Sequence, residues 1–127
     1  MEYNELTGMI IKTAIDIHRE LGPGLLESAY HEILFYELKK QKLHVEKDVP
    51  VPVIWEDVQL DIGYIADLVV EDKIIVELKA VEKIANVHKK QLLTYLKVAD
   101  KRLGLLINFN EVVLKDGITR IVNNLQE

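Results

Sequence analysis

Two stretches of sequence decide the fold: Ile65-Ala66-Asp67-Leu68-Val69-Val70 and, three residues later, Ile74-Ile75-Val76-Glu77-Leu78-Lys79. Most of their apolar residues are β-branched, which is typical of strands. Glu71-Asp72-Lys73, which joins the two stretches, has the polar character of a short turn. The sequence therefore predicts a hairpin of two antiparallel strands.

Three charged residues interrupt these apolar stretches: Asp67, Glu77 and Lys79. Residues two apart in a strand point to the same face, so Glu77 and Lys79 share a face. The turn could bring Asp67 beside Glu77, and two facing carboxylates repel unless a proton or a metal ion lies between them. Oxygen ligands of this kind suit Mg²⁺ or Mn²⁺. The alternative is an internal salt bridge of Lys79 with one of the acids, because structural ion pairs also occupy such positions.

The rest of the chain is interpreted from the spacing of its apolar residues, which is three to four in helices and two in strands. Pro50 and Pro52 each lack a donor for the strand ladder, so their strand is expected at the edge of the sheet. A strand–helix–strand unit after the hairpin implies one parallel pair. The class is therefore α/β (α+β), a central mixed sheet flanked by helices. The expected elements are helices at Tyr3–Leu21, Leu25–Gln41 and Ile84–Ala99, strands at Val45–Trp55, Gln59–Val70, Ile74–Lys79, Arg102–Asn108 and Val112–Lys115, and a closing helix from Ile118.

The composition narrows the class of protein. A chain of 127 residues predicts a single domain spanning residues 1–127. The chain has no cysteine, which excludes disulfides, Cys-based zinc sites and a cysteine nucleophile. It has neither a signal-like N-terminus nor an apolar run of about 20 residues, so we expect a cytoplasmic protein without a membrane segment. The net charge of −5 argues mildly against sequence-blind binding of nucleic acid.

Two helical patches supply further candidates for lining a site. Glu27, Tyr30 and His31 lie at i, i+3 and i+4 on the second predicted helix. Glu27 also has a purely structural explanation, because an acid in the first turn of a helix interacts favourably with the helix dipole. The third predicted helix carries His88, Gln91 and Tyr95 at i, i+3 and i+7, again on one face, and each could instead be a partly buried boundary residue.

Several blocks of the sequence, in order, resemble the GxxExxY proteins of the PD-(D/E)xK nuclease superfamily. The first block is Gly24-Leu25-Leu26-Glu27-Ser28-Ala29-Tyr30, which has the spacing that names the family. The similarity covers nearly the whole chain. The other blocks are Gly63–Val70, Ile75–Val81, Gln91–Leu96 and Gly104–Phe109.

The resemblance implies roles for particular residues. Asp67 corresponds to the metal-binding aspartate of the superfamily, Glu77 to its second carboxylate, and Lys79 to the lysine that activates water or steadies the transition state. Glu27 corresponds to a metal-binding acid carried by a helix. Gln91 corresponds to the catalytic glutamine of a QxxxY element whose tyrosine is Tyr95. The departure is Ala66, where the name of the superfamily has proline; this position carries no ligand.

The expected function is a metal-dependent phosphodiesterase that acts on DNA or RNA and uses Mg²⁺ (or Mn²⁺). A nuclease-fold module that binds a partner and cuts nothing is the alternative from another class, and the small size and acidic charge favour it. A third interpretation makes the three charges a structural ion-pair network. The oligomeric state, including a homo-oligomer, is left open by the sequence.

Overall fold

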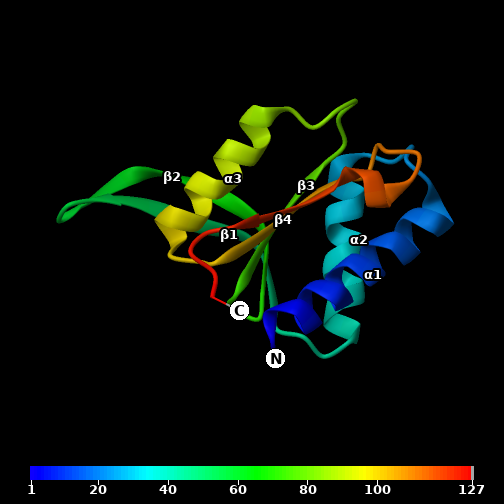
Figure 1. Cartoon of the computed structure of the whole chain (residues 1–127), viewed down its shortest axis with the longest axis horizontal. Coiled ribbons are helices and arrows are strands. Elements are labelled where there is room, and N and C mark those ends of the chain that lie inside the picture. Colours follow the sequence, from blue (N-terminus) through cyan, green and yellow to red (C-terminus); the bar gives the residue numbers. More distant parts are fainter. Residues whose placement is uncertain (127) are drawn as a thin grey trace.

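The computed structural model describes residues 1–126, with the backbone alone for residues 61 and 62. Within this part of the chain, three α-helices surround one sheet of five strands (Figure 1). The predicted class, a mixed sheet flanked by helices, is confirmed. In chain order the elements are α1 (Tyr3–Leu21), α2 (Glu27–Lys40), β1 (Val45–Trp55), β2 (Val58–Val70), β3 (Ile74–Lys79), α3 (Asn86–Ala99), β4 (Leu103–Asn108), the 3₁₀ helix η1 (Leu114–Gly117) and β5 (Ile118–Val122).

The strands lie in the sheet in the order in which they occur in the chain. β3 and β4 are parallel, with α3 as the connection, and the other neighbouring pairs are antiparallel. Glu71 and Asp72 both have positive φ, the conformation that tight hairpin turns favour, and they join β2 to β3 as predicted. β1, with its two prolines, lies at the edge.

The side chains of β3 alternate between two apolar clusters, one on each face of the sheet. The even-numbered residues belong to the larger cluster, which also contains residues of α1 and α2. Ile75 belongs to the smaller cluster, with residues of α3. Glu77 and Lys79 are two and four residues beyond Ile75, so they point to the face that α3 covers.

The strand predicted at Val112–Lys115 is wrong. Val112 is 87% exposed and Val113 is 55% exposed, so these apolar residues have no sheet to cover them. The chain turns here and forms η1, whose first residue, Leu114, packs into the larger cluster. Two adjacent valines gave the appearance of a strand, but a strand needs a partner as well as suitable residues.

The closing helix predicted from Ile118 is also wrong, because residues 118–122 form β5. Their sequence, Ile-Thr-Arg-Ile-Val, is mostly β-branched. β5 pairs antiparallel with β4 from Ile107↔Ile118 to Leu103↔Val122. The open edge of β4 thus determines the structure of this segment, which shows how tertiary pairing decides between helix and strand in a short apolar run.

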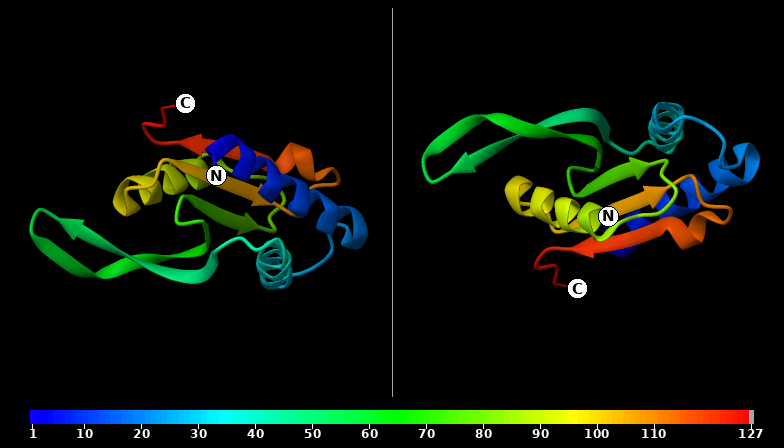
Figure 2. Two further views of the ribbon diagram at one scale, coloured as in Figure 1. Left: turned by 90° about the horizontal axis from the view of Figure 1, so that it is seen from below. Right: turned by 90° about the horizontal axis from the view of Figure 1, so that it is seen from above.

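The β1–β2 hairpin extends well beyond the rest of the molecule (Figure 2). Its end carries exposed apolar side chains, of which Trp55 is 71% exposed. The register of the two strands shifts between Pro52 and Ile54. Nearer the body, the hairpin passes beside α3, and its β2 strand leads directly to Asp67.

Candidate active site

A cavity of about 270 Å³ lies between the sheet and α3. Residues from five elements line it: the start of α2, strands β2, β3 and β4, and one face of α3. Seven residues singled out from the sequence are brought together here: Glu27, Asp67, Glu77, Lys79, His88, Gln91 and Tyr95. Segments far apart in the chain therefore converge on one small space.

Asp67 and Glu77 lie on neighbouring strands where the β2–β3 ladder ends. The last paired residues are Leu68 and Val76, one step before the two acids. The Asp67 carboxylate then accepts a hydrogen bond from the backbone N–H of Leu78, at 2.8 Å. A side chain thus replaces the next ladder bond, which fixes the carboxylate of Asp67 next to the end of β3.

Glu77 is a buried carboxylate, only 8% exposed. Its Oε1 atom is buried and has no hydrogen-bond partner. Burial, together with the negative charge of Asp67, raises the pKa of Glu77 to about 8, although the positive charge of Lys79 opposes the shift. A buried carboxylate without a partner is costly, and a divalent cation that prefers oxygen ligands would relieve that cost. The residues present therefore fit Mg²⁺ or Mn²⁺.

Lys79 lines the same cavity without forming an ion pair. Among residues 1–126, the ion pairs all lie elsewhere, and none joins Lys79 to Asp67 or Glu77. The interpretation of Asp67, Glu77 and Lys79 as a structural salt-bridge network requires an ion pair between the lysine and one of the acids, and this ion pair is not formed among the described residues. The ammonium group remains available to a ligand of the cavity.

Glu27 is the first residue of α2, and its side chain lines the cavity. Both explanations of this acid are compatible with its position. A carboxylate in the first turn interacts favourably with the positive end of the helix dipole. The same placement at a helix end directs a third carboxylate to the space that Asp67 and Glu77 line.

α3 presents His88, Gln91 and Tyr95 to the cavity, as their spacing predicted. The Nδ1 atom of His88 accepts a hydrogen bond from the backbone N–H of Ala85, at 3.0 Å. This bond caps the start of α3 and places the proton of a neutral imidazole on Nε2. In that tautomer His88 is a donor towards the cavity, not a metal ligand.

Tyr30 does not line the cavity, contrary to the prediction. It is fully buried, and its ring stacks on Phe109 with centroids 4.3 Å apart. Its hydroxyl donates to the carbonyl of Gly22 and accepts from the N–H of Leu25. The tyrosine of the GxxExxY spacing therefore holds the α1–α2 turn against the core.

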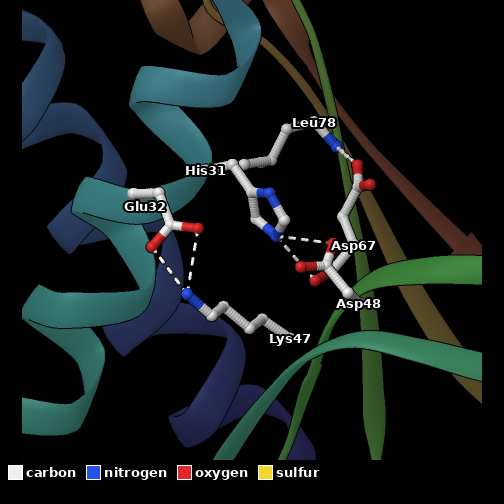
Figure 3. A network of polar contacts seen from close by, with 6 residues as sticks. All are labelled: His31, Glu32, Lys47, Asp48, Asp67 and Leu78. Atoms are coloured by element: carbon white, nitrogen blue, oxygen red, sulfur yellow. Dashed lines mark hydrogen bonds and ion pairs between the residues drawn. The ribbon is translucent and has the colours of Figure 1, made fainter.

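His31, the next residue, does not line the cavity but contacts the backbone of Asp67, which does. Its Nε2 lies 2.8 Å from the carbonyl oxygen of Asp67 and 3.8 Å from Oδ1 of Asp48 (Figure 3). The β1–β2 pairing omits Asp48 and Asp67, and Asp48 has a φ of 52°. The imidazole therefore donates to a carbonyl at an interruption in the ladder.

Among the described residues, His31, Glu32 and Asp48 are the one group of three acidic or histidine side chains whose possible metal-ligating atoms all lie within 4.8 Å of one another; Glu27, Asp67 and Glu77 do not meet this spacing as a set. Both carboxylate oxygens of Glu32 already accept hydrogen bonds from Lys47, at 2.7 and 3.0 Å (Figure 3). Glu32 and Asp48 are exposed. A cation here would compete with Lys47 and with the His31–Asp67 bond.

Tyr64 is a cavity residue that the sequence analysis missed. Its ring stacks on Tyr95, with centroids 3.6 Å apart and an angle of 11° between the planes. The available signal was a tyrosine three residues before Asp67 on the same predicted strand. The period of two could not predict the face on which Tyr64 lies, because the side chains of this strand do not alternate regularly between the two faces of the sheet. Ala66 and Val69, which are three residues apart, both belong to the apolar cluster on the α3 side.

Comparison with known proteins gives one match. The family model described as the PD-(D/E)XK nuclease superfamily matches residues 4–121 of the chain. No curated protein and no solved structure was found to match. The superfamily that the sequence resembles is thus confirmed, and the narrower resemblance to GxxExxY proteins stays a prediction. Within the described residues, no helix is long and apolar enough to cross a membrane.

Proposed function

The chain belongs to the PD-(D/E)XK nuclease superfamily, and we propose that it is a metal-dependent phosphodiesterase that cuts DNA or RNA. One observation carries the proposal. Glu77 is a buried carboxylate that shares a cavity with Asp67 and Lys79; among the described residues, one Glu77 oxygen has no hydrogen-bond partner and Lys79 forms no ion pair. Such an arrangement costs stability, and that cost is understandable where a ligand is bound.

Asp67, Glu77 and Glu27 would hold a Mg²⁺ or Mn²⁺ ion. Their donor set consists of carboxylate oxygens, which suit hard divalent cations. When bound, such an ion lowers the pKa of a coordinated water and polarises a phosphate. The hydrogen bond from Leu78 N–H to Asp67 fixes one of these carboxylates before any ligand arrives.

The other polar side chains act on the phosphodiester itself. In hydrolysis, a water oxygen bonds to phosphorus and the water gives up one proton; the bond to one ester oxygen breaks, and the departing oxygen takes up one proton. Lys79 offsets the negative charge that develops on the phosphoryl oxygens. Gln91, on the face of α3 that lines the cavity, offers an amide that can orient water or phosphate.

The test is cleavage of mixed single- and double-stranded DNA and RNA with Mg²⁺ and with Mn²⁺. We expect Lys79→Ala to lose activity by about a hundredfold or more, the usual scale for removing one electrostatic stabiliser. Folding and Mn²⁺ binding should survive, because the carboxylates remain. Lys90→Ala is the matched control, since Lys90 is an exposed lysine of α3 outside the cavity.

The alternative function is a binding module that cuts nothing. The net charge of −5 and the exposed Trp55 at the end of the β1–β2 hairpin favour it. A wild-type protein that binds Mn²⁺ but cuts none of the nucleic acids would contradict the phosphodiesterase and favour this module. Loss of cleavage in Lys79→Ala in proportion to a loss of folded protein would instead assign Lys79 a structural role.

A further inference from the structure

In the described part of the chain, two residues that line the cavity carry a buried polar atom without a hydrogen-bond partner. Among the described residues, three buried side-chain atoms lack a hydrogen-bond partner: Thr7 Oγ1, Tyr64 Oη and Glu77 Oε1. Two of these three belong to residues that line the same cavity. Buried polar groups in native proteins are nearly always hydrogen-bonded, so a pair of exceptions at one place indicates a ligand that completes them.

Tyr64 is held rigidly on both sides. The residue before it, Gly63, pairs with Pro52, and a Cβ at Gly63 would overlap the Val51 carbonyl oxygen. β1 and β2 therefore approach closely just before Tyr64. On its other side the ring stacks on Tyr95 of α3. A hydroxyl fixed in this way loses little freedom when it binds a ligand.

The hydroxyl of Tyr64 is a hydrogen-bond donor at neutral pH. A phenol has an ordinary pKa near 10. Burial raises the pKa of Tyr64 further, and the nearby negative charge of Glu77 adds to this effect. A protonated phenol offers an O–H, so it suits an anionic oxygen and is a poor ligand for a cation. The hydroxyl of Tyr64 therefore suits an anionic oxygen, whereas the carboxylates of the cavity suit a cation.

We propose that Tyr64 is a further catalytic residue, whose hydroxyl donates a hydrogen bond to a non-bridging oxygen of the scissile phosphodiester. The inference rests on the proposed function and adds to it. The carboxylates take the cation, while Tyr64 and Lys79 take the phosphoryl oxygens. Tyr95 is a positioning residue that acts through its stack on the ring of Tyr64.

Tyr64→Phe tests the proposal because it removes the hydroxyl and keeps the ring and its stack. We expect cleavage to fall by about tenfold to a hundredfold, mainly in kcat. Mn²⁺ affinity should stay within about twofold, and the metal-free protein should be equally stable or more stable, because an unpartnered polar atom is gone. Tyr36→Phe is the matched control, since Tyr36 is 62% exposed on α2.

A binding measurement separates this inference from the proposed function. Calorimetric titration with thymidine 5′-monophosphate in the presence of Ca²⁺ should show binding to wild type that Tyr64→Phe weakens by about tenfold. A wild type that cuts nothing but shows this difference would overturn the nuclease and leave Tyr64 as a phosphate ligand. Equal cleavage and equal nucleotide binding by the two proteins would overturn the role of Tyr64 alone.

Two further results complete the test. A wild type that neither cuts nor binds the nucleotide would overturn both proposals. If Tyr64→Phe failed to fold, as judged by circular dichroism, Tyr64→His would replace it, since histidine keeps an aromatic ring and can offer an N–H. That variant should bind the nucleotide more tightly than Tyr64→Leu does; equal affinities would overturn the hydrogen bond.

Discussion

Two groups of two carboxylates and one lysine lie on β-strands and helices of this small fold, and they differ in burial and pairing. In the first group, Glu32 and Asp48 are exposed, and Lys47 binds both oxygens of Glu32. In the second, Glu77 is buried and, within residues 1–126 as the structure describes them, one of its oxygens has no hydrogen-bond partner and Lys79 forms no ion pair. The same residue types therefore give a solvated surface network in one place and an incomplete site in the other.

This difference in burial and pairing is the reason why we propose the cavity group, and not the surface group, as the functional site. An exposed ion pair contributes little to stability and needs no ligand to explain it. A buried carboxyl group with an unpartnered oxygen destabilises the empty protein, so its presence points to a bound group. Two of the predictions below change a carboxylate of the cavity and compare it with Glu32 of the surface group, and one changes His31, which lies between the two groups.

The largest expected effect on stability concerns pH in EDTA. Burial and Asp67 hold the pKa of Glu77 at about 8 in the folded protein, far above its ordinary value. Between the two values the folded protein binds more protons than the unfolded chain, so stability falls as pH rises through this window and levels off above pH 8. The slope is up to about 1.4 kcal/mol per pH unit.

Urea unfolding at pH 5.5, 7 and 8.5 measures this slope. Glu77→Gln should lose most of it and should be more stable than wild type at pH 8.5. Glu32→Gln should keep the wild-type slope. Glu32 is exposed and the hydrogen bond from Lys47 lowers its pKa, so Glu32 does not titrate between pH 5.5 and 8.5. A wild-type stability that stays constant from pH 5.5 to 8.5 would argue against a buried, protonated Glu77.

A smaller effect is expected from His31, which links the two groups. Its Nε2 donates to the Asp67 carbonyl, so His31→Leu should lower Mn²⁺ affinity by about tenfold, as loss of a group that orients a metal ligand commonly does. His31→Gln, which keeps an N–H donor, should recover part of the affinity. Calorimetry on the three proteins checks this, and equal affinities would show that the bond does not position Asp67.

The sequence predicted the hairpin and its acids well because their signals are local. A three-residue turn between β-branched stretches leaves few ways to pair β2 with β3, and the period of two places Glu77 with Lys79. The spacing of His88, Gln91 and Tyr95 was equally local. Spacing offered Glu27 only as a candidate for lining a site, and its expected role as a metal ligand beside Asp67 and Glu77 came from the family resemblance.

The wrong predictions concern residues whose structure depends on contacts with distant parts of the chain. Residues 118–122 could form either a helix or a strand until the open edge of β4 pairs with them. Tyr30 lies one turn of α2 beyond Glu27, yet it points to the core. There its ring stacks on Phe109 and its hydroxyl donates a hydrogen bond to the α1–α2 turn. Tyr64 was missed because the irregular alternation near Asp67 hides the face on which it lies.

The central claim is that Asp67 and Glu77 bind a divalent cation in the cavity. The most direct test is thermal unfolding of wild type, Glu77→Gln, Asp67→Asn and Glu32→Gln, with and without Mn²⁺. We predict that Mn²⁺ stabilises wild type and Glu32→Gln alike, by about 2.7 kcal/mol at a hundred times Kd, and does little for the two cavity variants. Equal stabilisation of all four proteins, or loss of stabilisation in Glu32→Gln alone, would place the ion elsewhere and contradict the account.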